Sequence, residues 1–254
     1  MLSVRNLAKT FGGLTAVDHI SFDLGETAVT GLVGPNGSGK STLFHLITGF
    51  YRADQGEIRY GNAGITGMPP HALSRMGLVR TFQHTRILPF LTVMDNLLAA
   101  APKQSGESLF YLLFRPDRVR AQETANSEKA LGILKQIHLD HMTHELAGRL
   151  SYGQGKLLEI GRVMMADPRL VLLDEPTAGI NPTLIRQLVD IIGTVTAEGI
   201  QIFLIEHNMP LVSELCDRIL VMDAGNIIFE GSPEAAREDE GVVSAYLGRA
   251  NHVA

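Results

Sequence analysis

The sequence predicts an α/β protein with a mainly parallel sheet, an antiparallel β subdomain at its start and a helical subdomain inserted into the core. Three observations support this prediction. Residues 34–41, GPNGSGKS, join the apolar run AVTGLV to the helix-like segment KSTLFHLITG. Strand-length apolar runs alternate with helical segments from Arg169 onward, which is typical of parallel strands joined by crossovers. Between these parts, apolar residues recur at helical spacing from about residue 91 to residue 150.

Composition limits the classes of function. The 254 residues are 45% hydrophobic, which is enough to bury a substantial core. The net charge is −5 and no block of Lys or Arg stands out, so nucleic acid is not expected as a ligand. The single Cys216 excludes an internal disulfide and fits a reducing compartment.

No segment resembles a secretory signal or a membrane span. The start MLSVRNLAKTFGG lacks a long apolar core, and runs such as LVLL and IFLI are far shorter than the ~20 residues that cross a bilayer. We therefore expect a chain that is soluble by itself and associates with a membrane only through another protein.

The first elements alternate apolar and polar residues, in LSVRNL and HISFDL. In the second run Ile20, Phe22 and Leu24 face one way while Ser21 and Asp23 face the other, which predicts antiparallel strands with one solvated face. The buried strand AVTGLV, the glycine-rich loop with its helix, and a short strand pair around GEIRYGNAGI follow.

The middle of the chain has helical signals. Thr92 and Asp95 have the spacing of a capping box before NLLAAA. The charged segment 116–139 carries Leu131, Leu134 and Ile137, which we expect on one apolar face.

These patterns predict a single domain over residues 1–254. Its core and β subdomain comprise 1–90 and 155–254, and the inserted helical subdomain comprises 91–154. The runs RLVLLD, QIFLIE and RILVMD then supply further parallel strands of the core.

The glycine-rich loop has the chemistry of the phosphate-binding loop of an NTPase. Its glycines allow backbone N–H groups to converge on phosphate, and the following helix directs its positive end at the same anion. Lys40 can reach the β and γ phosphates of a nucleotide, and Ser41 offers a hydroxyl to Mg²⁺. A glycine-rich turn that merely holds a Lys is the alternative. The residues expected to contact nucleotide here are Gly34, Pro35, Asn36, Gly37, Ser38, Gly39, Lys40, Ser41 and Thr42.

Two strand-like runs end in polar residues that suit catalysis. LVLLDE places Asp174 and Glu175 at the carboxyl end of a strand, where ligands of open α/β sheets lie. Asp174 can hold Mg²⁺ through water, and Glu175 is then free to polarise an attacking water. His207, after IFLIE, could contact a γ-phosphate. Two solvated acids and a surface His are the alternatives.

LSYGQ supplies a second helix start suited to an anion. Ser151 and Gln154 have the spacing of a capping box before KLLEIGRVMMA, with Gly153 between them. One nucleotide does not need two such sites, so the second is expected to serve a partner's nucleotide.

The chain resembles the ATP-binding cassette ATPases, the nucleotide-binding subunits of ABC transporters. The resemblance covers nearly the whole chain and rests on five motifs in the family's order: GPNGSGKST, Gln83 in RTFQ, LSYGQ, LVLLDEP and His207 in IEHN. GLVRTFQHTRILPFLTVMDNLL, SYGQGKLLEIGR, DEPTAGINP and AYLGRA look most like the subunits of branched-chain amino-acid importers.

The resemblance implies a phosphate-loop NTPase (RecA-like) core. It also implies two cassettes packed head to tail, with ATP sandwiched between one phosphate loop and the other subunit's signature serine. It implies that Phe11 stacks on adenine and that Gln83 touches Mg²⁺ and the attacking water. Glu175 would be the general base and His207 the γ-phosphate switch. The residues implied to complete the opposite site are Ser151, Gly153 and Gln154.

Three positions depart from the family pattern. Phe11 stands where Tyr is usual, which keeps the stacking face. Tyr152 replaces the first Gly of the signature, as is common in this importer-like branch. Asn181 stands where many cassettes have Asp and carries no charge, so we expect communication between the two sites to be weighted differently.

Other features have simpler interpretations. Arg115, Arg118 and Arg120 are interpreted as a solvated helix face. His138, His141 and His144 could suggest a metal site, but no Cys or carboxylate set completes it.

The resulting hypothesis is an ATPase subunit of an importer for branched-chain or hydrophobic amino acids. It would sit at the cytoplasmic face of the membrane, with a second cassette, permease subunits and, indirectly, a periplasmic binding protein. The alternatives are a cassette for urea, another amino acid or lipopolysaccharide, and a soluble cassette of DNA repair or translation. A GTPase or small-molecule kinase would leave LSYGQ without a purpose.

Overall fold

The computed structural model describes residues 1–81 and 87–247. The chain divides into two compact units. The sheet unit consists of Met1–Arg80, Arg169–Pro176 and Thr196–Ala254. The helical unit consists of Thr81–Pro168 and Thr177–Val195.

A six-stranded sheet forms the centre of the sheet unit, in the order β10-β9-β3-β8-β7-β6. Its strands are β3 (Val29–Val33), β6 (Leu78–Arg80), β7 (Leu170–Asp174), β8 (Gln201–Ile205), β9 (Arg218–Asp223) and β10 (Asn226–Gly231). All neighbours are parallel except β9 and β10. Every residue of β3 and β7 is buried, as expected of central parallel strands. The predicted parallel core is confirmed.

An antiparallel sheet in the order β2-β1-β4-β5 completes the unit. It contains β1 (Leu2–Phe11), β2 (Leu14–Asp23), β4 (Gln55–Tyr60) and β5 (Ala63–Gly64). Ile20 and Phe22 are buried while Ser21 and Asp23 are exposed, which confirms the predicted alternation. The sheet therefore presents one apolar face to the core and one face to water.

The two sheets share a core with helix α1 (Lys40–Ile47). The Phe203 ring of β8 lies 5.8 Å from Phe22 of β2 and 5.0 Å from Phe44 of α1, measured between centroids. This packing anchors the start of α1 at the carboxyl end of β3. The remaining helices of the unit are α2 (Pro70–Arg75), α8 (Met209–Leu215), α9 (Pro233–Glu238) and α10 (Glu240–Leu247).

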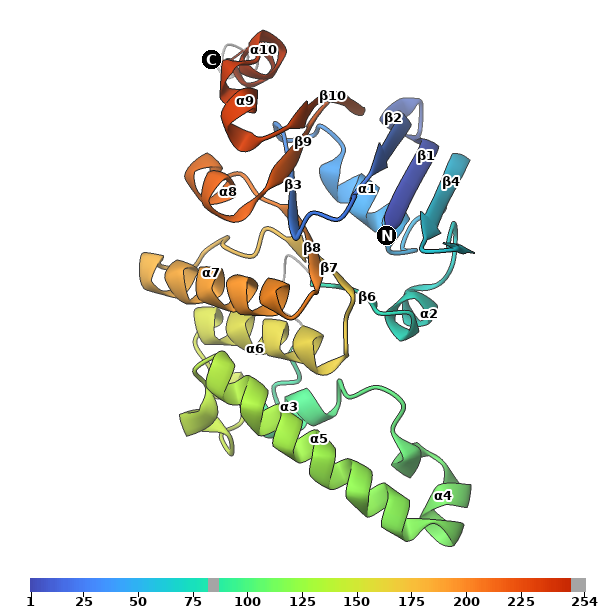
Figure 1. Ribbon diagram of the computed structural model, residues 1–254, viewed down its shortest axis with the longest axis vertical. Coiled ribbons are helices and arrows are strands. Elements are labelled where there is room, and N and C mark those ends of the chain that lie inside the picture. Colours follow the sequence, from blue (N-terminus) through green and yellow to red (C-terminus); the bar gives the residue numbers. More distant parts are fainter. Residues whose placement is uncertain (82–86, 248–254) are drawn as a thin grey trace. The chain divides into compact units, whose positions relative to one another are not determined.

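The helical unit is built on α3, α5 and α6, which pack against one another (Figure 1). The Thr92 hydroxyl accepts a hydrogen bond from the Asp95 N–H, so Thr92 caps α3. The Asp95 carboxylate accepts from the Thr92 hydroxyl, so only the first half of the predicted capping box is seen. The elements of the unit are α3 (Val93–Leu98), η1 (Ser105–Glu107), α4 (Leu109–Phe114), α5 (Pro116–Gln136), η2 (Asp140–Met142), η3 (Ala147–Arg149), α6 (Tyr152–Met165) and α7 (Pro182–Ala197), the last of which ends beyond it.

The packing of α5 corrects one prediction. Leu134 and Ile137 are buried, but Leu131 is 42% exposed. The buried face instead includes Ala130 and Ile133, because residues at i, i+3, i+4 and i+7 share a helix face whereas a strict spacing of three drifts around it.

The helical unit contains the segment 91–154 and extends beyond it, to α6 and most of α7. A Cβ on Gly161 of α6 would lie 2.8 Å from Ile137 and 3.1 Å from Leu97. Since α6 packs this closely on α3 and α5, it groups with them in space. No helix among residues 1–81 and 87–247 is long and apolar enough to cross a membrane.

Candidate functional site

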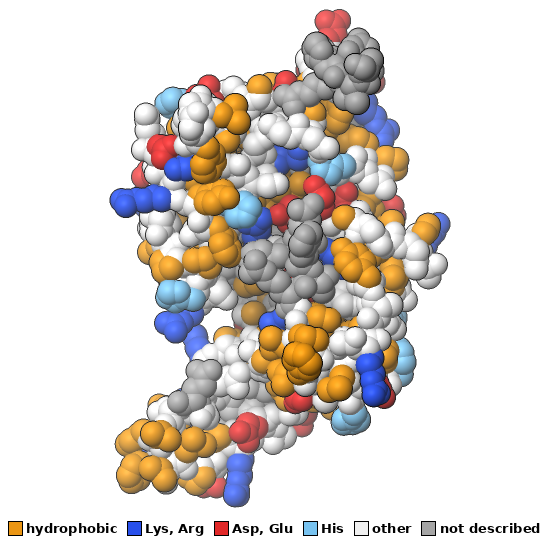
Figure 2. Space-filling view, turned by 180° about the vertical axis from the view of Figure 1, so that it is seen from behind, with side chains coloured by type: hydrophobic (Ala, Val, Ile, Leu, Met, Phe, Trp, Pro, Cys, Tyr) orange, Lys and Arg blue, Asp and Glu red, His pale blue; other side chains and the backbone are white. Residues whose placement is uncertain are grey.

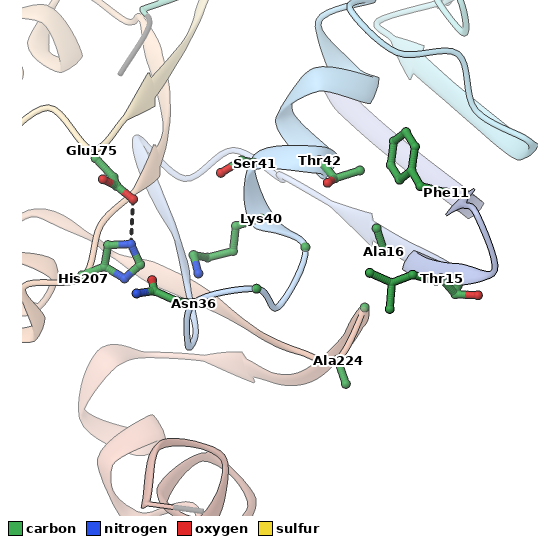
Figure 3. A pocket seen from close by; sticks show the side chains of 14 residues that line it. Phe11, Thr15, Ala16, Asn36, Lys40, Ser41, Thr42, Glu175, His207 and Ala224 are labelled. Atoms are coloured by element: carbon green, nitrogen blue, oxygen red, sulfur yellow. Dashed lines mark hydrogen bonds and ion pairs between the residues drawn. The ribbon is translucent and has the colours of Figure 1, made fainter. Parts of the chain in front are cut away.

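A pocket of roughly 500 Å³ lies in the sheet unit (Figure 3). Its walls come from the β1–β2 hairpin, the glycine-rich loop with the start of α1, the ends of β7 and β8, and the β9–β10 turn. It is lined by Phe11, Leu14, Thr15, Ala16, Asn36, Gly37, Gly39, Lys40, Ser41, Thr42, Glu175, His207, Ala224 and Gly225.

Two glycines let the loop pass close to neighbouring backbone. Gly34 has φ +144°, and a Cβ there would lie 2.0 Å from the Met222 carbonyl oxygen. Gly39 has φ +106°, and a Cβ there would lie 2.1 Å from the Ala16 carbonyl oxygen. Only glycine fits both the left-handed backbone and the contact, so these residues are needed to shape the loop before any ligand binds.

The loop surrounds the Lys40 ammonium. Nζ donates to the carbonyl oxygens of Gly34 and Pro35, at 2.8 Å each, and Lys40 is only 5% exposed. Lys40, Ser41 and Thr42 are the first residues of α1 and line the middle of the pocket (Figure 3). A positive side chain and a helix N-terminus thus converge where an anion would lie.

Glu175 and His207 lie together at one end of the pocket (Figure 3). The Glu175 carboxylate Oε1 is 2.7 Å from Nε2 of His207. Glu175 follows β7 with φ +48°, and its N–H donates to the Ile205 carbonyl at the end of β8. The left-handed turn after the strand directs this carboxylate into the pocket, away from the surroundings of its neighbour Asp174.

Asp174 is buried and forms an ion pair that sequence reasoning missed. Its Oδ2 is 2.6 Å from Nη2 of Arg80, and the two side chains are 6% and 5% exposed. Arg80 ends β6, the strand beside β7, and its guanidinium also donates to the Thr48 hydroxyl. Asp174 does not line the pocket, although its chain neighbour Glu175 does.

The opposite end of the pocket is aromatic. The Phe11 ring makes an edge contact with Tyr51 at 5.3 Å between centroids, and Lys9 Nζ lies 5.2 Å from the Phe11 ring. Phe11 is 41% exposed, so much of its ring remains accessible. A planar base could stack there while its phosphates lie at the loop.

The LSYGQ segment lies in the helical unit. Ser151 caps α6: its Oγ accepts from the Gln154 N–H, and Gln154 Oε1 accepts from the Ser151 N–H, which confirms the capping box. Gly153 is buried, and a Cβ there would lie 2.0 Å from Leu184 Cδ1. The Asn181 side chain accepts from the Leu184 N–H, so it caps the start of α7.

The oxygen donors fit a divalent cation held mainly by a nucleotide. Mg²⁺ usually takes one or two protein ligands together with phosphate oxygens and waters. The Ser41 hydroxyl lines the pocket and is such a donor, whereas the Asp174 carboxylate is buried against Arg80 and does not line the pocket. Within the described part of the chain, no group of three His, Cys, Asp or Glu residues could hold a metal by itself. That includes the region of His138, His141 and His144.

The structure brings most of the expected residues together. Of those named from the sequence, nine line the pocket: Phe11, Asn36, Gly37, Gly39, Lys40, Ser41, Thr42, Glu175 and His207. Gly34, Pro35 and Ser38 belong to the glycine-rich loop but do not line the pocket. Gln83 lies outside the described residues.

Sequence reasoning missed the walls formed by residues 14–16 and 224–225. The DAGN turn between β9 and β10 could be recognised from its residue types. Its position could not: the Gly225 N–H donates to the Ser38 carbonyl, a contact between segments far apart in sequence.

Comparison with known proteins agrees with this geometry. Residues 17–178 match the family model described as ABC transporter. The high-affinity branched-chain amino acid transport ATP-binding protein BraF of Pseudomonas aeruginosa is 39% identical over 251 residues, covering 98% of each chain. The probable branched-chain amino acid transport ATP-binding protein LivG of Archaeoglobus fulgidus is 40% identical, covering 98% of this chain and 95% of the relative.

Solved structures give the same assignment. The ADP conformation of MJ1267, an ATP-binding cassette of an ABC transporter, is 38% identical, covers 98% of both chains and has a TM-score of 0.83. A nucleotide-free ATP-binding cassette from an ABC transporter has a TM-score of 0.81 at 39% identity. Residues 17–178, more than half of the chain, match the family model, and relatives about 39% identical cover 98% of the chain, so this protein belongs to the ABC transporter family of ATP-binding cassettes.

Proposed function

We propose that this chain hydrolyses ATP to power a branched-chain amino-acid importer. The observation that carries the catalytic part is the pocket itself, which places Phe11, Lys40 and the Glu175–His207 pair along one cavity. The substrate class is supported by the relatives' names alone, because a cassette binds nucleotide and its fold does not indicate the cargo.

In this proposal the pocket holds ATP along its length. Adenine stacks on Phe11, and the loop amides with Lys40 hold the β and γ phosphates. Ser41 and Gln83 would hold Mg²⁺, and Asp174 would act on it through a water molecule. The metal would neutralise charge on the phosphates as the γ-phosphoryl group leaves.

Glu175 is the proposed general base. It accepts a proton from a water whose oxygen forms a bond to the γ-phosphorus, while the bond from that phosphorus to the β–γ bridging oxygen breaks. The products are ADP and phosphate. His207, which contacts the Glu175 carboxylate at 2.7 Å, is suited to orient it and to respond to the γ-phosphate.

The proposed partners are a second cassette and two or more permease subunits. Ser151, Gly153 and Gln154 would face the nucleotide of the second cassette, which is either a copy of this chain or a similar one. Binding of ATP would close the pair and move the permease, and an extracytoplasmic binding protein would deliver the cargo. The chain would then lie at the cytoplasmic face of the membrane, held there by its permease.

The test is Glu175→Gln, which removes the base and keeps the size of the side chain. We expect ATP binding to persist, turnover to stop, and a dimer to appear by size-exclusion chromatography with light scattering only when ATP is present. Glu198→Gln, at an exposed position of the sheet unit, is the matched control and should hydrolyse ATP normally.

The outcomes separate the parts of the proposal. Undiminished hydrolysis by Glu175→Gln would falsify the assignment of the base. A monomer that binds ATP would instead show that pairing needs a sister cassette or the permease subunits.

A further inference from the structure

Helix α4 exposes an unusual concentration of large apolar side chains. Its sequence is LFYLLF, and none of its six residues is buried. Leu109, Leu113 and Phe114 are 76%, 74% and 68% exposed, and Phe110 is 61% exposed. These side chains form the orange cluster at the lower left of Figure 2. A monomeric protein rarely leaves such a contiguous apolar patch in water unless it binds something.

The helix is held in place by polar contacts at its base. The Ser105 N–H donates to the Gln122 side chain, whose Nε2 donates to the Lys103 carbonyl. The Arg118 guanidinium lies over the Tyr111 ring at 5.1 Å. These contacts tie η1 and α4 to α5, so the exposure of the apolar residues belongs to an ordered hairpin.

The apolar arc of α4 is broad. At about 100° per residue, Leu112, Leu109, Leu113, Phe110 and Phe114 cover an arc of about 200° around the helix axis. A helix that docks in a protein groove offers a narrower stripe of residues at i, i+3, i+4 and i+7. Lipid chains in the outer hydrocarbon of a bilayer can contact a helix on most of its sides, so they suit an apolar arc of this width better than a protein groove does.

Arginines lie directly beside the apolar cluster. Arg115 follows α4, and Arg118 and Arg120 lie in the first turns of α5; all three are exposed. Among the described side chains, none of the three forms a salt bridge, unlike Arg5, Arg80, Arg149 and Arg218. Leu and Phe flanked by Arg is the composition of helices that bind anionic membrane surfaces, and Tyr is enriched at the same interface.

We propose that α4 is a membrane-surface anchor that inserts its Leu and Phe side chains among anionic lipids while Arg115, Arg118 and Arg120 contact the headgroups. These arginines are then a lipid-binding face and not merely a solvated one. The anchor gives the chain a membrane contact of its own, in addition to the permease contact of the proposed function. It does not depend on ATP hydrolysis or on the identity of the cargo.

Co-sedimentation of the full chain with vesicles tests the anchor. We expect binding to vesicles of phosphatidylglycerol and phosphatidylethanolamine, and weak binding to phosphatidylcholine alone. The double variant Phe110→Ser/Leu113→Ser should bind at least roughly tenfold less, because two large side chains no longer enter hydrocarbon. Each Arg→Gln change at Arg115, Arg118 or Arg120 should weaken binding to anionic vesicles about fivefold, and added salt should reduce the difference.

Matched controls separate the anchor from general surface effects. Leu131→Ser removes an exposed Leu elsewhere on α5, and Arg59→Gln removes an exposed Arg on β4; neither should change vesicle binding. Circular dichroism and ATPase activity should be unchanged in all variants. Failure of the wild-type chain to bind anionic vesicles, or equal binding by the double variant, overturns the proposal. Self-association in solution that Phe110→Ser/Leu113→Ser abolishes would also overturn it, by assigning the patch to a second copy of the chain.

Discussion

Replacing Arg80 with Met should destabilise the fold strongly, because it leaves the Asp174 carboxylate buried without its guanidinium partner. The two side chains are about 5% exposed and joined at 2.6 Å. Arg80 also lies over the Phe44 ring at 5.7 Å, so Met at this position retains much of the apolar packing.

The size of the effect follows from this burial. Removing one member of a buried ion pair costs about 3–5 kcal/mol of unfolding free energy. For a chain of this length each kcal/mol lowers Tm by roughly 2–4 °C, so we expect a decrease of about 6–20 °C. Replacing both partners, as Arg80→Met/Asp174→Leu, should recover much of the loss, since no uncompensated charge remains.

Thermal unfolding by circular dichroism, without nucleotide, measures these changes. Arg5→Met is the matched control: Arg5 and Asp23 are joined at 2.7 Å, but their side chains are 46% and 55% exposed. Water solvates that pair in both states, so its loss should change Tm little. If Arg80→Met lowered Tm no more than Arg5→Met does, the reasoning from burial would be refuted.

Three further predictions concern the pocket and the core. Phe11→Ala should raise the Kd for ATP roughly fivefold to hundredfold by removing a stacking surface, while Phe11→Tyr should leave the Kd nearly unchanged. Fluorescence titration with a labelled nucleotide measures both, and equal Kd values for Phe11→Ala and wild type would contradict stacking. Gly39→Ala should abolish ATP binding, because the new Cβ would lie 2.1 Å from the Ala16 carbonyl oxygen. Gly64→Ala is the control: its Cβ would have no atom within 4 Å, so this variant should bind ATP normally in equilibrium dialysis. Burial raises the pKa of Cys216 to about 12, so its thiol stays protonated at neutral pH. A thiol reagent should therefore react with Cys216 only on unfolding, and fast labelling of the folded chain would show that Cys216 is accessible.

Some features of this protein were determined by residues close together in the sequence. The glycine-rich loop was recognisable because consecutive residues set its backbone, and Gly34, Gly37 and Gly39 all have positive φ. The helix caps at Thr92 and Ser151 were recognisable for the same reason: a cap is a contact across three residues. Buried parallel strands could be predicted from continuous apolar runs such as LVLLD, because the run itself is a local pattern of the sequence.

Only the tertiary structure decided which distant residues meet. Arg80 pairs with Asp174 because β6 and β7 are neighbours in the sheet, and the sequence carries no sign of that adjacency. The exposure of Leu131 and of the whole of α4 likewise depends on which face of a helix finds a partner. Glu175 and His207 could each be expected near a phosphate, but their direct contact required β7 and β8 to end side by side. Local sequence patterns indicate the conformation of a segment, whereas the burial and pairing of its side chains depend on the segments packed against it.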